Sequence, residues 1–235
     1  LIEQLQLKRL PRQLLVTAIG AIGDPRGQRA LLGLLDDPSV DIRIGALKAL
    51  AKIVDGRAAE PLTRQLRSPN RRVRGLAISF LGRLQARTAT LPLIALLGKA
   101  DLEESRRAAA ALATIGDPRA LDKAIELLTH RDRLLRRTAV QAIANLQGKR
   151  LPKRKEVARG LVALCKRQAH DVRANCLQAL GNLLRGSSDP EVLSYLIANL
   201  QLNDHTLFLS ALDGVSAMQD PRIVDTLASR IPDLP

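Results

Sequence analysis

A repeat of 31 residues constrains the fold of this chain more than any other feature of its sequence. Each of the first five repeats opens on a polar residue, and apolar residues follow 3, 7 and 10 positions later. A unit of this length cannot bury its apolar face alone, so the periodicity predicts a stacked array of supersecondary elements. The opening positions are Arg12, Arg43, Arg74, Ser105 and Arg136, and the apolar columns are Leu15, Ala46, Ala77, Ala108 and Ala139, then Ile19, Leu50, Leu81, Leu112 and Ile143, then Ile22, Ile53, Leu84, Ile115 and Leu146.

The apolar spacing within a repeat is that of an α-helix. In residues 42–53 the apolar positions follow a 3.6-residue period and form one stripe. Several of these helices end in an Asp-Pro turn, at 24–25, 117–118 and 220–221. The Asp can accept backbone N–H bonds there, and the Pro occupies the first helical position, which needs no N–H donor. A second helix follows, so each repeat is predicted to be a pair of antiparallel helices.

Two local patterns carry a family resemblance. The repeated helix has a V-R-x-x-A-x-x-A-L-like pattern, with its closest matches at 73–82 (VRGLAISFLG) and 172–181 (VRANCLQALG), and the turn reads I-G-D-P-R-A at 115–120. Together they resemble the HEAT-repeat family, in particular its bacterial phycobiliprotein-lyase-like (PBS lyase-like) type. The resemblance covers nearly the whole chain, and it implies an all-α fold, a right-handed α-solenoid of about seven HEAT-like helical pairs.

The repeats are predicted to form one array over residues 1–235. Neither end shows the polar cap that protects the terminal apolar face of a solenoid, so we expect the array to be part of a longer chain. The spacing breaks after Arg136, because the next equivalent arginine is Arg173, 37 residues on. The six extra residues fall in a basic insertion at 148–155, which is either a solvated loop or a contact for phosphate or an acidic protein.

The formal net charge of +14 is unevenly distributed along the chain. Residues 131–173 contain 13 Lys or Arg against 3 Asp or Glu, whereas residues 186–235 contain 2 against 7. Such an excess bears on partners and association rates, and it predicts an anionic partner. By resemblance to HEAT arrays, the helix that begins at the repeated arginine lines the inner, concave surface. The exposed basic positions of this helix are the predicted partner-binding residues: Lys48, Lys52, Arg71, Arg72, Arg83, Arg106, Arg107, Arg133 and Arg137.

The repeated arginines are expected to have a structural role instead. A position that recurs in every repeat favours contacts between repeats over contacts with a ligand. We expect these arginines to pair with an Asp, such as Asp24, Asp55 or Asp117, in a ladder that joins successive repeats.

Three functions remain open at this point. The favoured one is a non-catalytic protein-interaction scaffold that binds an acidic protein or peptide in a basic concave groove. The alternative is a nucleic-acid-binding protein that contacts the phosphate backbone, although aromatic residues for base stacking make up only 1% of the chain. A bilin-lyase-type subunit, implied only by the family resemblance, is the least favoured. The charge gradient also permits self-association.

No residue set in the sequence indicates catalysis. No phosphate-binding loop or nucleophile motif occurs, and His130, His170 and His205 lie in separate repeats without zinc-ligand spacing. We therefore expect no enzyme activity, metal or cofactor. Cys165 and Cys176 are expected to be reduced core residues, which predicts a cytoplasmic location. The longest apolar run, at 14–23, is too short to span a membrane.

Overall fold

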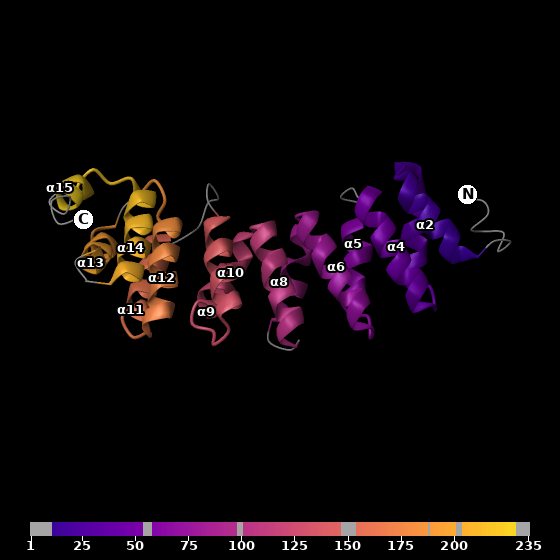
Figure 1. The fold of residues 1–235 in the computed structure, drawn as a ribbon, viewed down its shortest axis with the longest axis horizontal. Coiled ribbons are helices and arrows are strands. Elements are labelled where there is room, and N and C mark those ends of the chain that lie inside the picture. The colour runs from indigo at the N-terminus through magenta and orange to yellow at the C-terminus, as the bar shows by residue number, and fades with distance from the viewer. Residues whose placement is uncertain are drawn as a thin grey trace. The chain divides into compact units, whose positions relative to one another are not determined.

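The computed structural model describes residues 11–53, 58–97, 101–146, 154–187, 189–200 and 204–228, and every regular element in them is helical (Figure 1). Two sets of helices alternate along the chain. The first helices are α2 (Arg12–Ile22), α4 (Val40–Ile53), α6 (Arg71–Arg83), α8 (Leu102–Ile115), α10 (Arg133–Ala144), α12 (His170–Leu183) and α14 (His205–Met218). The second helices are α3 (Gln28–Gly33), α5 (Ala59–Gln65), α7 (Thr90–Leu96), α9 (Leu121–Leu127), α11 (Arg154–Cys165), α13 (Pro190–Leu200) and α15 (Ile223–Ala228).

Short 3-10 turns precede or follow some of the second helices. They are η1 (Pro25–Gly27), η2 (Leu34–Asp36), η4 (Arg87–Ala89) and η5 (Pro118–Ala120). The described residues thus contain seven first helices and seven second helices, which confirms the predicted all-α array of about seven helical pairs.

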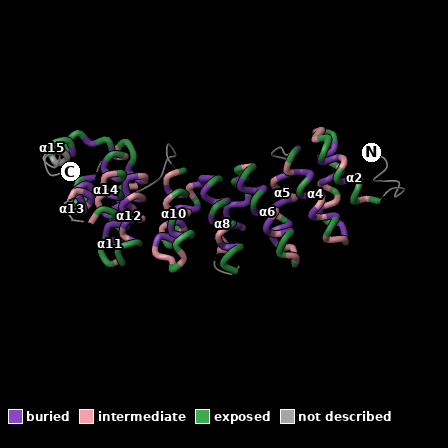
Figure 2. Tube along the Cα trace, viewed as in Figure 1, coloured by how far each residue is buried: buried purple, intermediate pink, exposed green. Residues whose placement is uncertain are grey.

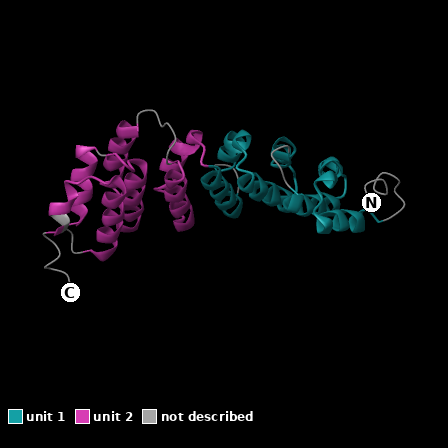
Figure 3. Ribbon diagram, turned by 90° about the horizontal axis from the view of Figure 1, so that it is seen from above, with its two compact units in different colours: residues 1–115 teal, residues 116–235 magenta. Residues whose placement is uncertain are grey.

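The helices group into two compact units, residues 1–115 and 116–235 (Figure 3). In unit 1, α2, α4, α6 and α8 pack one against the next, and α3, α5 and α7 pack on them as a second layer. In unit 2, α10, α12 and α14 form the corresponding row, with α9, α11 and α13 against it. That residues 1–235 form one array stays a prediction.

The repeat columns supply the core of each unit (Figure 2). The positions three residues after the repeated arginine are at most 2% exposed, and those seven residues after it are at most 4% exposed. Both columns therefore lie between the two layers, as predicted. The third column departs from this at Ile22, the last residue of α2, which is 62% exposed.

Neighbouring first helices approach closely where glycine replaces a side chain. A Cβ on Gly181 of α12 would lie 2.3 Å from the Cα of Gly214 on α14. No side chain fits in that space, so the two backbones pack directly on each other.

Candidate functional site

The turns between the two helices of a pair form as predicted. The Asp24 carboxylate accepts the backbone N–H of Arg26 at 2.8 Å, and Asp117 accepts that of Arg119 at 2.9 Å. In both turns the same arginine also donates its guanidinium to the same carboxylate. These hydrogen bonds lower the pKa of Asp24 to about 2.

The repeated arginine of the third repeat makes two kinds of contact. Nη1 of Arg74 donates to the backbone carbonyls of Ser68, at 2.9 Å, and Pro69, at 3.1 Å, in the turn that precedes α6. Nε and Nη2 donate to the two carboxylate oxygens of Glu104 in α8, at 2.6 and 3.1 Å. One side chain thus fixes its own turn and joins two successive repeats. The bond to Glu104 raises the pKa of Arg74.

Two other arginines of the column reach the following repeat in the same way. Arg12 pairs with Asp37, in the turn before α4, and Arg136 pairs with Asp171 in the first turn of α12. Among the described residues, Arg43 donates to carbonyl oxygens of its own turn, at Asp37 and Pro38, and pairs with no acid.

The predicted ladder therefore exists, but two of its predicted acids were wrong. Asp24 and Asp117 bind Arg26 and Arg119, which stand two residues away in the same turn. The turn itself places each of these carboxylates beside the arginine two residues later, so the carboxylate pairs with that arginine. Asp55 lies outside the described residues.

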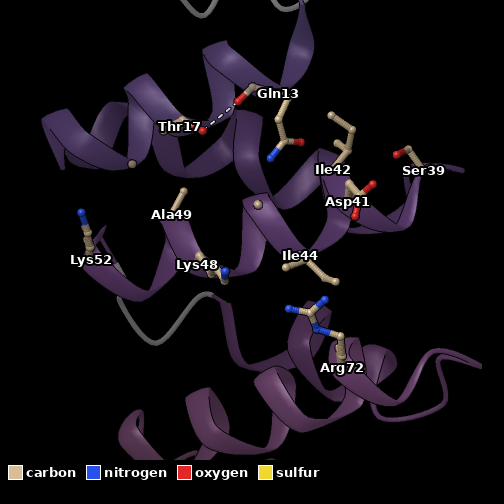
Figure 4. A pocket seen from close by; sticks show the side chains of 12 residues that line it. Gln13, Thr17, Ser39, Asp41, Ile42, Ile44, Lys48, Ala49, Lys52 and Arg72 are labelled. Atoms are coloured by element: carbon tan, nitrogen blue, oxygen red, sulfur yellow. Dashed lines mark hydrogen bonds between the residues drawn. The ribbon is translucent and has the colours of Figure 1, made fainter.

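The exposed face of the first helices in unit 1 contains a hollow of about 720 Å³ (Figure 4). Lys48 and Lys52 stand along α4, and Arg72 extends from α6 toward Ile44 of α4. Because Lys48 and Lys52 are four residues apart on a helix, they share one face. None of these three cations forms an ion pair with any residue in the described part of unit 1. The remaining lining residues are Gln13, Thr17, Gly20, Ser39, Asp41, Ile42, Ile44, Gly45 and Ala49. We name this surface the α2–α4–α6 hollow.

Some of these lining residues were missed by the sequence reasoning. Gln13 and Thr17 are exposed positions of α2, and the spacing of its apolar columns places them outside the buried stripe. Asp41 lies in the first turn of α4 and is the one acid among the lining residues. With three cations and one carboxylate, the lining carries a net charge of 3 − 1 = +2.

Three other predicted cations of unit 1 are paired with acids. Nε of Arg71 lies 3.1 Å from the carboxylate of Asp101, and Arg106 and Arg107 approach Glu103 at 3.9 and 3.1 Å. The backbone N–H of Glu104, and after it the charge of Arg71, holds the pKa of Asp101 below its ordinary value. These pairs reduce the positive charge that Arg71, Arg106 and Arg107 can offer to a ligand.

The guanidinium of Arg83 also has contacts within unit 1. Its Nη2 donates to the carbonyl oxygen of Ala51 at 3.2 Å, and its Cζ lies 5.9 Å from the centre of the Phe80 ring. A carbonyl and a ring leave the positive charge of Arg83 unneutralised. Arg83 is not among the residues that line the α2–α4–α6 hollow.

Unit 2 has a corresponding hollow of about 670 Å³ on α10, α12 and α14. Arg133 and Arg137 line it and form no ion pair with a residue that the structure describes in this unit. Arg136 also lines it, but its charge is paired with Asp171. His170 stands at the start of α12, with Nε2 2.6 Å from the carboxylate of Asp204, a contact that the sequence did not indicate. We name this surface the α10–α12–α14 hollow.

The basic insertion at 148–155 lies outside the described residues except for its last two, Arg154 and Lys155, which begin α11. Cys165 and Cys176 are buried free thiols, as predicted. The hydrogen bond with Cys176, together with burial, raises the pKa of the Cys165 thiol, so this sulfur is protonated at neutral pH.

The described residues show neither a metal-binding cluster nor a membrane-spanning helix. No group of three or more His, Cys, Asp or Glu in these residues is arranged to hold a metal ion. Among the helices described, none combines the length and the apolar character that crossing a bilayer requires.

A family model and several solved structures are similar to this chain. The model for HEAT repeats matches residues 1–82, 59–144 and 122–212. No curated protein matches the chain in sequence.

The structural similarities concern the fold alone, because all identities are low. An engineered protein is 21% identical, with a TM-score of 0.59 over 82% of this chain and 96% of the other. A designed armadillo repeat protein in complex with the peptide (KR)4 is 20% identical, with a TM-score of 0.57 over 83% and 99%. The complex of CpcE and CpcF of phycocyanin lyase from Nostoc sp. PCC7120 is 21% identical, with a TM-score of 0.52 over 97% and 92%.

Proposed function

The chain belongs to the HEAT-repeat family, and on this premise we propose that it is a non-catalytic interaction scaffold that binds an acidic segment of a partner protein. The segment occupies the α2–α4–α6 hollow in unit 1, and the α10–α12–α14 hollow offers a second site of the same kind. One observation carries the proposal: Lys48, Lys52 and Arg72 line a single hollow, and no described acid pairs with them.

Unpaired like charges in one hollow favour an anionic ligand. The positive potential of these side chains attracts carboxylates of a partner. Lys48 and Lys52 are exposed and hydrated, so each contact adds little affinity, but together they speed association and select the sign of the partner. The expected interaction is therefore fast, salt-sensitive and specific for acidic sequences.

The fold is suited to a peptide ligand. A designed armadillo repeat protein with a similar fold was solved in complex with the peptide (KR)4. In the present chain the unpaired charges are positive, so the complementary peptide is acidic.

Two features favour a protein segment over nucleic acid. Asp41 lines the hollow, and its carboxylate can accept N–H groups of a peptide backbone, which a phosphodiester backbone does not offer. In addition, no Phe, Tyr or Trp lines either hollow, so the bases of a single strand have none of these rings on which to stack.

A salt titration with matched variants tests the proposal. Fluorescence anisotropy would measure binding of a labelled Glu-rich peptide and of a labelled duplex DNA, each at several salt concentrations. We expect the peptide to bind, and Lys48→Glu and Arg72→Glu each to weaken it about fivefold or more, with a shallower dependence on salt.

Arg29→Glu is the matched control, because Arg29 is an exposed residue of α3 in the second layer and its reversal changes the net charge equally. The control should bind as the unaltered protein does. Equal losses in Arg29→Glu and Lys48→Glu would mean that only net charge matters, and tighter binding of duplex DNA would favour the nucleic-acid alternative.

A further inference from the structure

The second layer of unit 1 contains an apolar groove between α5 and α7. The groove has a volume of about 650 Å³, and Leu66, Pro92, Ala95 and Leu96 supply most of its lining. We name it the α5–α7 groove. It belongs to the other layer of helices from the α2–α4–α6 hollow, and the two surfaces share no residue.

The composition of α7 sets this part of the second layer apart. Its sequence, TLPLIAL, contains no charged residue, whereas each of the other second helices in the described chain contains at least one. Leu91 is 58% exposed, and Ala95, one turn later on the same side, is also exposed. A helix that only faced water would carry polar residues at these positions. The face of α7 is thus suited to contact with another apolar surface.

Two arginines stand beside this apolar lining. Arg64 and Arg67 both line the groove, and neither pairs with an acid among the described residues of unit 1. The remaining polar lining residue, Thr63, donates its hydroxyl to the carbonyl oxygen of Ala59 at 2.7 Å. The groove therefore presents a ligand with an apolar surface and two positive charges, and the Thr63 hydroxyl proton is already donated.

We propose that the α5–α7 groove binds an amphipathic helix of a partner protein, with an apolar stripe in the groove and acidic residues facing Arg64 and Arg67. An extended strand is disfavoured, since both walls are helices whose backbone groups are already paired and cannot add a strand. A helix satisfies its own backbone bonds and presents apolar residues at i, i+3 or i+4, and i+7, which is the spacing that a groove between two helices can accept. This second surface does not depend on the acidic-peptide site of the first helices.

Three synthetic helices test the chemistry of the groove. The first probe has about 18 residues, long enough to be helical in isolation, with a Leu stripe flanked by Glu. The second replaces Glu with Lys, and the third replaces the stripe Leu with Gln. Fluorescence anisotropy measures the binding of each probe to the full chain. The first probe should bind, the second should bind roughly tenfold more weakly than the first, and the third should bind at least roughly tenfold more weakly than the first.

Protein variants locate the site. Ala95→Gln places a polar side chain in the groove without changing charge, and it should weaken the first probe roughly tenfold. Ala198→Gln makes the same change at an exposed position of α13 in unit 2 and should have no effect. Arg64→Glu and Arg67→Glu should each weaken the probe about threefold. Because the first probe is itself acidic, Ala95→Gln is also measured in a Lys48→Glu background. It should still weaken the probe roughly tenfold there, which separates the α5–α7 groove from the α2–α4–α6 hollow.

Three outcomes would overturn the inference. The groove is not the site if the first probe fails to bind, or if Ala95→Gln and Ala198→Gln bind it equally. The occupant is a second copy of this chain if sedimentation shows a concentration-dependent dimer that Ala95→Gln abolishes. Circular dichroism of each variant establishes that it is folded before binding is measured.

Discussion

The ion pair between Arg74 and Glu104 joins α6 to α8. We expect removal of Arg74 to lower the free energy of unfolding more than removal of the Glu104 charge does. The side chain of Glu104 is 6% exposed, whereas that of Arg74 is 23% exposed. Arg74→Met leaves a buried carboxylate without its cation, a change that ordinarily costs ~3–5 kcal/mol. Glu104 stands in the first turn of α8, where the helix dipole favours an anion, so we expect a loss of about 3 kcal/mol.

The opposite change, removal of the Glu104 charge, leaves an arginine that keeps other hydrogen-bond partners. In Glu104→Gln the Arg74 guanidinium keeps its bonds to the carbonyls of Ser68 and Pro69, at 2.9 and 3.1 Å, and has partial access to water. We expect a loss of about 1–2 kcal/mol. The double variant should lose less than the sum of the two, because neither group is then left without a partner.

Urea unfolding followed by circular dichroism measures these differences, and hydrogen exchange of the α6 and α8 amides shows whether the loss is local, since repeat arrays need not unfold in one step. Arg71→Met is the matched control. Arg71 is in the same helix and pairs with Asp101, which directly precedes α8. The side chains of Arg71 and Asp101 are 61% and 45% exposed. The effect of Arg71→Met should be much smaller than that of Arg74→Met. If Arg71→Met matched Arg74→Met, or if Glu104→Gln were the more damaging half, the burial argument would be refuted.

Two further predictions concern unit 2. Gly181→Ala should destabilise the protein by about 2 kcal/mol or more despite the higher helix propensity of alanine, because the new Cβ would lie 2.3 Å from the Cα of Gly214. Gly160→Ala in α11, where nothing lies within 4 Å of the new Cβ, should stabilise the protein by about 0.5–1 kcal/mol. Thermal unfolding that shows the same sign for both variants would contradict this. The bond from Arg159 holds the pKa of Asp189 below its ordinary value, so the charged Asp189 stabilises the folded state above about pH 4 and that contribution is lost as the pH falls through the lowered pKa. Asp189→Asn keeps a cap for α13 but removes the charge, so its stability at neutral pH should fall and its loss of stability below about pH 4 should be smaller. An acid titration identical to that of the unaltered protein would count against the pairing.

The core and the turns of this protein were predictable from sequence because their causes are local or periodic. Burial recurs at the same phase of every repeat, so aligning the repeats identifies buried residues such as Ala46 and Leu81 without knowledge of any contact. The Asp-Pro turns follow from the chemistry of consecutive residues, and the bond between Asp24 and the Arg26 N–H is an instance.

The acids of the arginine ladder could not be predicted in this way, because they do not recur at a fixed distance. They stand 25 residues after Arg12, 30 after Arg74 and 35 after Arg136, and Arg43 has no acid in the described part of the next repeat. Alignment of the repeats therefore identifies the donor but not the acceptor. The acceptor depends on the turn preceding the next helix, whose length and sequence vary from repeat to repeat.

The same distinction decides which cations remain for a partner. Counting exposed basic residues on the first helices treats Arg71, Arg106 and Lys48 alike, because all three lie outside the apolar stripe. In the structure an acid of the same or the next helix pairs with Arg71 and Arg106, and no described acid pairs with Lys48. The charge that a ligand meets is what remains after these internal pairs have formed. Among the predicted partner-binding residues of unit 1, the cations without a described acid partner are Lys48 and Lys52 of α4 and Arg72 and Arg83 of α6. A partner should therefore distinguish individual repeats although their cores are alike.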